Sequence, residues 1–404
     1  MNWIEKMIAE QCPNGVKKVK LGEVGAFENI GTDKKIVEGE QLVTLLNYVD
    51  IYHHKKISPS IPNMVVSAND KKIESCTVEK GDVFVTPTSE TPDDIGHSAV
   101  ITQSIPNAVY SYHIMRYRQF THNMTTSYYI NYCFDSISVQ KQIQKKAQGI
   151  TRFGLSKDKF ASIEIPLPPL SIQKEIVSVF DKFSELIEKT DEEIALRQKQ
   201  YEYYREKLLT FEKGEVEWKK LGKVCDILTG FPFKSSLFSK KGIRLMRGMN
   251  VKRGYFDFND EDDRYWPDSN GLEKYLLAKD DIIISMDGSL VGKSFCILEE
   301  KHLPLLLVQR VARIRTTLCN IHYIYQNIKF RFADYVDKKK TAGAIPHVSQ
   351  KDIENLEIPL PSPSRQQEIV ATLDKFEALI SKLKEERELR QKQYEYYREK
   401  LLTF

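Results

Sequence analysis

The sequence has no run of apolar residues approaching the roughly 20 that a membrane-spanning helix needs. Its first residues, MNWIEKMIAEQ, lack the profile of a signal peptide. Its six cysteines stand singly, with no Cys-x-x-Cys pair and no histidine at metal-ligand spacing, so we expect core or surface thiols rather than a metal site. A formal net charge of +4 permits a nucleic-acid partner without requiring one. We therefore expect a cytoplasmic protein with no membrane partner.

Motifs for catalysis are also missing. Residues 287–294, DGSLVGKS, nearly spell a phosphate-binding loop, but Asp287 stands where that loop requires glycine, and its carboxylate would repel a phosphate. Pro267-Asp268, followed distantly by Glu299-Glu300-Lys301, is a poor version of a metal-dependent nuclease site. The sequence also lacks the glycine-rich loop and the Asn/Asp-Pro-Pro-aromatic motif that methyl transfer to a base usually requires. We expect no catalysis by this chain and no cofactor bound to it.

The chain is internally repeated. Residues 196–211, LRQKQYEYYREKLLTF, recur letter for letter at residues 389–404, and the match continues upstream at the same shift from IPLPPLSIQKEIV at Ile165 to IPLPSPSRQQEIV at Ile358. Between these matched stretches the two halves barely resemble each other. Matching connectors and dissimilar globular parts predict one frame that carries two different domains.

Each repeated stretch has the pattern of a long helix. Its apolar and aromatic positions step by alternating fours and threes, which is the heptad seam of a coiled coil. Each helix should run for about forty residues, or about 60 Å at 1.5 Å per residue. The two seams consist of Ile176, Phe180, Phe183, Ile187, Thr190, Ile194, Arg197, Tyr201, Tyr204 and Leu208 in the first copy, and Ile369, Leu373, Phe376, Ile380, Leu383, Arg387, Arg390, Tyr394, Tyr397 and Leu401 in the second.

Neither helix can bury its seam alone, so each is expected to pair with the other inside one chain. The first helix carries the chain away from the first globular part and the second returns, which predicts an antiparallel coiled coil with pseudo-two-fold symmetry. The alternative is a homodimer in which the two copies pair between chains. Tyrosine and arginine in the seam, where leucine would pack better, indicate that this face also meets other proteins.

The remaining sequence predicts two α+β domains. Strand signals dominate each half until aromatic residues at helical spacing appear in residues 128–146 and 321–340. Each half closes on a glycine-containing loop, at residues 148–158 and 342–352, followed by a strand and a Pro-Leu-Pro turn. We expect globular parts over residues 1–169 and 213–362, and long helices over residues 170–212 and 363–404.

The order of these features resembles the specificity subunit of a type I restriction-modification system. The features are the Leu-Gly-x-Val openings at residues 21–24 and 221–224, the Gly-Asp-Val and Asp-Asp-Ile strands at residues 81–83 and 280–282, the closing loops, the Glu-Ile-Val helix starts and the duplication. The resemblance spans essentially the whole chain. It implies two target recognition domains, each reading one half of a split DNA sequence. It also implies that the helices set the gap between the halves and dock two methyltransferase subunits.

The resemblance also implies further partners and cofactors. Double-stranded DNA is the ligand, S-adenosylmethionine belongs to the methyltransferase subunit, and ATP and magnesium belong to a restriction subunit where the system has one. The sequence leaves open which bases are read and whether a restriction subunit is present. The competing interpretation is a two-headed scaffold that joins two proteins and never touches DNA.

Candidate DNA contacts are loop residues with forked, amide or cationic side chains. Arginine can pair two acceptors on guanine and asparagine two groups on adenine, whereas lysine mostly meets phosphate. For each candidate, an ordinary exposed surface residue is the alternative. The candidates are Thr88, Ser89, Arg152, Phe153 and Lys157 in the first domain, and Arg247, Asn250, Lys252, Arg253, Ser289, Lys293 and His347 in the second.

Overall fold

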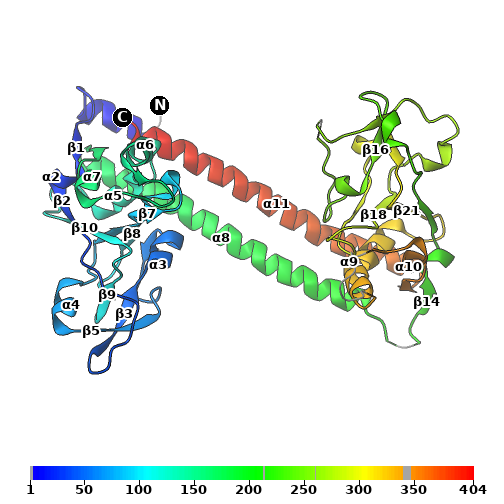
Figure 1. Ribbon diagram of the computed structural model, residues 1–404, viewed down its shortest axis with the longest axis horizontal. Coiled ribbons are helices and arrows are strands. Elements are labelled where there is room, and N and C mark those ends of the chain that lie inside the picture. Colours follow the sequence, from blue (N-terminus) through cyan, green and yellow to red (C-terminus); the bar gives the residue numbers. More distant parts are fainter. Residues whose placement is uncertain (1–2, 213, 260, 340–346) are drawn as a thin grey trace. The chain divides into compact units, whose positions relative to one another are not determined.

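The computed structural model describes residues 3–212, 214–259, 261–339 and 347–404 (Figure 1). Residues 342–346 of the second closing loop lie outside the described residues. The chain divides into two compact units, Met1–Asp191 with Glu385–Phe404 and Glu192–Lys384. Each unit holds one mixed globular part and half of each long helix. Within the described ranges, no helix combines the length and apolar character needed to cross a membrane.

The first unit is built on two sheets. A five-stranded sheet has the order β2-β10-β6-β8-β4, a three-stranded sheet has the order β5-β3-β9, and β1 pairs with β13. The strand bounds are β1 Lys18–Lys20, β2 Gly25–Glu28, β3 Gln41–Leu46, β4 Lys56–Ile57, β5 Met64–Ala68, β6 Val83–Val85, β8 Ser98–Ile101, β9 Ala108–Tyr110, β10 Met115–Gln119 and β13 Glu164–Pro166. The helix bounds are α1 Trp3–Gln11, α2 Leu21–Val24, α3 Tyr48–His53, α4 Asp70–Ser75, α5 Ser127–Cys133, α6 Ile137–Lys146 and α7 Lys157–Ala161.

Aromatic side chains fill the core between the larger sheet and helices α5, α7 and α8. Tyr117, Tyr129 and Tyr132 are fully buried there. Because a buried hydroxyl needs a partner, each one donates a hydrogen bond: Tyr117 Oη to Leu21 O at 3.1 Å, Tyr129 Oη to Pro166 O at 3.1 Å and Tyr132 Oη to Asp181 Oδ1 at 2.6 Å. The last bond ties the globular part to α8.

The second unit repeats this plan with a different sequence. The order β15-β21-β18-β19 matches β2-β10-β6-β8, and the parallel pair β16 and β20 matches β3 and β9. The strand bounds are β14 Glu217–Lys220, β15 Asp226–Thr229, β16 Ile243–Met246, β17 Tyr265–Trp266, β18 Ile282–Ser285, β19 Phe295–Ile297, β20 Leu305–Leu307, β21 Val311–Arg315 and β22 Glu357–Leu360, and the helices are α9 Ile321–Asp337 and α10 Gln350–Glu354. The expected α+β class is confirmed in both units.

The two long helices are α8, Leu170–Leu209, and α11, Pro363–Leu402, each of 40 residues. In the first unit Phe183 stacks on Tyr397 with ring centroids 5.7 Å apart. In the second unit Phe376 stacks on Tyr204 at 5.3 Å. Phe183, early in α8, contacts Tyr397, late in α11, whereas Tyr204, late in α8, contacts Phe376, early in α11. The helices are therefore antiparallel. The expected pairing inside one chain is confirmed.

One buried ion pair occurs at the same place in both units. Asp82, 1% exposed, accepts hydrogen bonds from Arg118 Nε at 2.6 Å and Nη2 at 2.7 Å. Asp281, 0% exposed, accepts from Arg315 Nε at 2.6 Å and Nη2 at 2.7 Å. The hydrogen bonds that each arginine donates to its aspartate raise the pKa of that arginine above the usual value. These aspartates are the acidic residues of the Gly-Asp-Val and Asp-Asp-Ile motifs, so both motifs encode one structural clamp.

We predict that Asp82→Ala destabilises the first unit and Asp281→Ala the second. Each variant leaves a partly exposed guanidinium without its carboxylate, which should cost about 2–3 kcal/mol. Denaturant unfolding of the full chain measures the cost, and limited proteolysis locates the loosened unit. Asp93→Ala, which changes an exposed aspartate, is the matched control. Equal proteolysis of both units in either variant would contradict the prediction.

Candidate functional site

A small sheet in the first unit brings together four of its five predicted DNA-contact residues. Strands β11 Gln148–Gly149, β12 Phe153–Gly154 and β7 Thr88–Ser89 lie side by side, with Phe153 opposite Ser89. Arg152 Nη2 donates to Thr88 Oγ1 at 3.2 Å. Gly149 makes this hairpin possible, because a Cβ there would lie 2.0 Å from Arg152 O. The turn therefore presents an oriented guanidinium next to a threonine hydroxyl.

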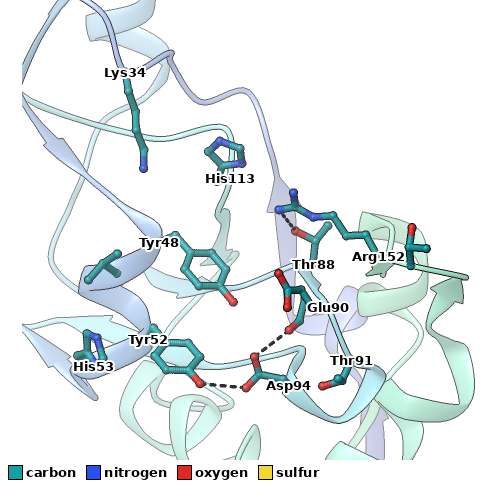
Figure 2. A pocket seen from close by; sticks show the side chains of 13 residues that line it. Lys34, Tyr48, Tyr52, His53, Thr88, Glu90, Thr91, Asp94, His113 and Arg152 are labelled. Atoms are coloured by element: carbon teal, nitrogen blue, oxygen red, sulfur yellow. Dashed lines mark hydrogen bonds between the residues drawn. The ribbon is translucent and has the colours of Figure 1, made fainter. Parts of the chain in front are cut away.

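Beside this sheet lies an open groove of about 1020 Å³. Its walls include Tyr48 and Tyr52 from α3, Glu90, and the cationic side chains Lys34, His113 and Arg152. Figure 2 shows Lys34, His113 and Arg152 above the ring of Tyr48 in this view, with Tyr52 and Asp94 below it. The groove thus has one cationic side and one side formed by tyrosine and carboxylate. A polar ligand with negative charge along one edge would fit this arrangement.

Asp94, in the 3-10 helix Pro92–Asp94, holds the wall of the groove in place. Its carboxylate accepts from Ser89 Oγ at 2.8 Å and Tyr52 Oη at 3.2 Å, and it lies 2.9 Å from His97 Nε2. Burial acts to raise the pKa of Asp94, but hydrogen bonds with His97, Ser89 and Tyr52 together hold it below the usual value. The hydrogen bond to Asp94 in turn raises the pKa of Tyr52. At neutral pH the wall therefore combines a carboxylate with a neutral phenol.

The cationic side of the groove disfavours further positive charge. Burial lowers the pKa of His113, and the charges of Lys34 and Arg152 lower it further, whereas Asp33 acts in the opposite direction. Lys34 and Arg152, beside a neutral histidine, make this side a site of positive potential. A bound phosphate would relieve the repulsion between these two cations.

The fifth candidate of the first unit, Lys157, lies around the adjoining hollow. This hollow has a volume of about 520 Å³ and shares Thr88, His113 and Arg152 with the groove. Thr88, Ser89, Arg152 and Lys157 therefore lie on one continuous surface, whereas Phe153 packs against the core of the unit. Sequence reasoning missed Lys34, Tyr48, Tyr52 and His113, which join this surface from separate segments. The one local signal was the spacing of Tyr48 and Tyr52, whose rings stack on one face of α3 at 5.9 Å.

In the second unit the corresponding place is occupied by Asp287. Its backbone forms a bridge with that of His347, as Thr88 in β7 pairs with β12. Its carboxylate accepts from Arg310 Nη1 at 2.7 Å and contacts His347 Nδ1. Burial acts to raise the pKa of Asp287, but these two partners hold it below the usual value. Residues 287–294, which resemble a phosphate-binding loop in sequence, therefore form a turn fastened by a carboxylate, and this turn leads into β19.

The remaining candidates of the second unit divide into exposed and enclosed residues. Ser289 and Lys293 are exposed on the turn after Asp287, and Arg253 is exposed on a neighbouring turn. Arg247 Nη1 donates to Asp262 O at 3.0 Å, and Lys252 pairs with Asp257 at 3.4 Å.

The prediction that Asn250 contacts a base is wrong. Asn250 is 2% exposed, and its side-chain amide donates to Asp257 O at 2.9 Å and Asp263 Oδ1 at 3.3 Å. Its Oδ1 accepts from Arg247 N at 3.1 Å. Every polar atom of this amide is used to fold the turn, so none faces a ligand.

The seam tyrosines also face inward. Tyr201 Oη donates to Glu377 Oε1 at 2.6 Å, and Tyr394 packs on Phe180 with ring centroids 5.7 Å apart. The outward residues of the repeat are a leucine and a tyrosine, each present twice. Exposure is 65% for Leu196, 59% for Tyr203, 54% for Leu389 and 59% for Tyr396. The repeat thus presents one apolar and aromatic patch in two copies.

Among the residues that the structure describes, no group of three or more histidine, cysteine, aspartate or glutamate side chains could hold a metal ion.

Comparison with known proteins gives a consistent result. Residues 13–196 and 213–391 each match the family model of the type I restriction modification DNA specificity domain. The chain is 32% identical over 299 residues to the type I restriction enzyme EcoR124I/EcoR124II specificity subunit of Escherichia coli, covering 70% of this chain and 72% of that one. It is 30% identical over 282 residues to the putative specificity subunit S.HindORF215P of Haemophilus influenzae, covering 63% and 68%.

Solved structures show the same fold. The crystal structure of the type I restriction-modification S subunit from M. genitalium matches with a TM-score of 0.60 at 14% identity, covering 97% of both chains. A structure reported for complex assembly and conformational transition of a type I system matches with a TM-score of 0.56 at 17% identity, covering 96% of this chain and 98% of that one.

We predict that Asp94→Asn loosens the groove wall and lowers stability by about 1 kcal/mol near pH 7, because Tyr52, Ser89 and His97 lose a charged acceptor. The folded pKa of Asp94 is depressed, so its contribution is fully present above the unfolded pKa of about 4 and is lost as the pH falls through the folded value. Denaturant unfolding between pH 3 and pH 7 should show that the difference in free energy of unfolding between variant and parent becomes smaller in acid. A difference that grows in acid would contradict this assignment.

Proposed function

The chain belongs to the type I restriction-modification DNA specificity family, and we propose that each of its units reads one half of a split DNA target through the groove surface described above. One observation carries the proposal: the two units share a strand order and a buried clamp, yet Thr88 holds Arg152 in one unit where Asp287 holds His347 in the other. A common scaffold with different surface side chains suits the reading of two unlike base sequences. The interpretation as a scaffold that never touches DNA has no support in this family.

In the first unit, Arg152 is the proposed base reader. Thr88 fixes one nitrogen of its guanidinium, which leaves the other donors free for the two acceptors of guanine. Lys34, His113 and Lys157 surround it and are proposed to contact phosphates, which position the protein without specifying sequence.

In the second unit, His347 is the proposed reader, because it is exposed on the closing loop beside the turn of Asp287. Its backbone bridge with Asp287 corresponds to the pairing of Gly154 with Thr88, so His347 stands two residues beyond the position of Arg152. Ser289, Lys293 and Arg253 are proposed as the exposed residues around it. Asp287 and Arg310 position His347 rather than meet DNA themselves.

The long helices are proposed to fix the gap between the half-sites and to dock the methyltransferase. The outward patches around Tyr203 and Tyr396 have identical sequences, and the two tyrosines are equally exposed. Two identical patches suit two copies of one partner. Catalysis, S-adenosylmethionine, and any ATP and magnesium are proposed to belong to partner subunits in the cytoplasm.

We predict that Arg152→Ala and Lys157→Ala have different effects. Loss of Arg152 should cost about 1–3 kcal/mol of discrimination at one position of the first half-site. Loss of Lys157 should weaken binding to all sequences and reduce the salt slope by about 1. Sequencing of modified bases and salt titrations of the assembled complex measure both effects. Lys71→Ala, on α4, is the control, and relaxed specificity in the second half-site after Arg152→Ala would refute the division of labour.

We predict that Tyr203→Ala with Tyr396→Ala prevents capture of the methyltransferase subunit, because both outward patches lose their aromatic anchor. Either single variant should retain one copy instead of two. Co-purification followed by native mass spectrometry counts the copies. Glu192→Ala with Glu385→Ala, a pair of exposed glutamates related by the repeat, is the control. Two bound copies in the double tyrosine variant would remove the patches from this role.

A further inference from the structure

Two cysteines of the second unit meet where the main sheet joins the following helix. Asp226 of β15 lies opposite Arg315 of β21, so Cys225 and Thr316 are the next residues beyond the paired strands. Thr316 Oγ1 donates to Val224 O at 2.5 Å and lies 3.6 Å from Cys319 Sγ. The loop then folds back, because Leu318 N donates to the same Thr316 oxygen at 3.1 Å. This turn places Cys319 near the start of β15.

Both cysteines are partly exposed to solvent and pack against the same apolar cluster of the second unit. A hydrogen bond with Cys225 lowers the pKa of Cys319, against burial, which acts to raise it, and Thr316 lowers it further. The hydrogen bond with Cys319, together with burial and the charge of Asp226, raises the pKa of Cys225. Within the pair, Cys319 is therefore the thiol that loses its proton more readily.

The other buried cysteines differ. Burial raises the pKa of Cys133 to about 12 and raises that of Cys296 above its usual value. The thiolate is the form that reacts with oxidants, so Cys319 is the residue poised to react.

We propose that Cys225 and Cys319 form a reversible oxidation site, at which a peroxide closes a disulfide inside the second recognition unit. The Cys319 thiolate attacks one peroxide oxygen, the O–O bond breaks, and the released hydroxide takes up a proton to leave as water. The sulfur of Cys225 then attacks the resulting sulfenic acid, and its hydroxyl leaves with the Cys225 proton as a second water. Two thiols are oxidised and one hydrogen peroxide is reduced to two waters. A small thiol in excess reverses the bond by exchange.

The disulfide would act on the place where the loop before α9 is hydrogen-bonded to α11, which we call the joint. Asn320 follows Cys319, and its backbone N–H donates to Gln366 Oε1 on α11 at 3.0 Å. Its side chain also caps α9 by accepting from His322 N at 2.9 Å. A bond from Cys319 to Cys225 would fasten this joint to β15.

The first unit provides an internal control. Thr126 N donates to Gln173 Oε1 on α8 at 3.1 Å, which is the same joint. Gly25 follows Val24 as Cys225 follows Val224, and Thr125 precedes Thr126 as Cys319 precedes Asn320. The first unit therefore has glycine and threonine in place of the thiols. Oxidation should alter reading of the second half-site alone, a consequence that rests on the proposed function, whereas the oxidation chemistry does not.

The chemistry is tested on the full chain with stoichiometric hydrogen peroxide, followed by alkylation and peptide mass spectrometry. The expected product is a Cys225–Cys319 crosslinked peptide, two hydrogens lighter, that disappears after dithiothreitol. Cys225→Ser should abolish the crosslink and leave a sulfenic acid at Cys319 that dimedone traps. Cys319→Ser should abolish both products, and Cys296→Ser should change neither. Oxidation of other cysteines first, or a crosslink only between chains, would overturn the proposal.

The consequence is tested with the chain assembled with its methyltransferase partner. The affinity of the complex is measured for DNA duplexes altered in one half-site or the other, before and after the complex is treated with peroxide. Oxidation should change discrimination at the second half-site, and Cys225→Ser should be unresponsive. An equal change at both halves, or none, would overturn the link between oxidation and reading. Absence of DNA binding by the reduced complex would instead contradict the proposed function.

Discussion

The antiparallel seam between the two long helices is the contact on which the rest of the molecule depends. The pair of Phe183 with Tyr397 in the first unit recurs as Phe376 with Tyr204 in the second. Each aromatic pair contributes about 0.5–1.5 kcal/mol beyond its buried area, so most of the stability of the seam comes from the buried apolar residues around them. Because the repeat supplies both partners, each helix finds its complement inside the same chain. One polypeptide can therefore carry two different recognition units on one frame.

The two units share their buried ion pairs but differ in their loops. The clamps of Asp82 with Arg118 and of Asp281 with Arg315 have the same hydrogen-bond distances, 2.6 and 2.7 Å. The loops after β6 and β18 differ in sequence and chemistry, with a threonine holding an arginine in one unit and an aspartate holding a histidine in the other. Stability is thus provided by strands and buried charge pairs. The side chains proposed to meet DNA lie on the loops after β6 and β18 and on the closing loops.

The architecture was predictable from the sequence because it rests on periodicity. The duplication, the heptad seams and the alternating strands all lie in consecutive residues, and they gave the fold class and the antiparallel pairing. The groove was less predictable. Lys34, Tyr48 and His113 belong to segments that meet only because β3 pairs in parallel with β9, a long-range contact that no local pattern encodes.

One error has an identifiable cause. Asn250 was taken for a base reader because residue type was used as a guide to exposure. In the structure its amide folds its own turn, whereas Tyr201, expected in the seam, meets a carboxylate across the seam. Polar side chains close to a turn or a helix end often find partners within the chain, and only tertiary packing shows which do.

The glutamines Gln173 and Gln366 occupy the same position at the start of the two long helices, and each accepts from the backbone N–H that precedes a helix of its globular part. This attachment uses a main-chain donor, which every residue except proline supplies. At this attachment, a replacement globular part would need only a backbone that follows the same path, whatever side chains it carries there. The chain is therefore built for piecemeal evolution, in which one head is exchanged or mutated while the other keeps its inherited preference.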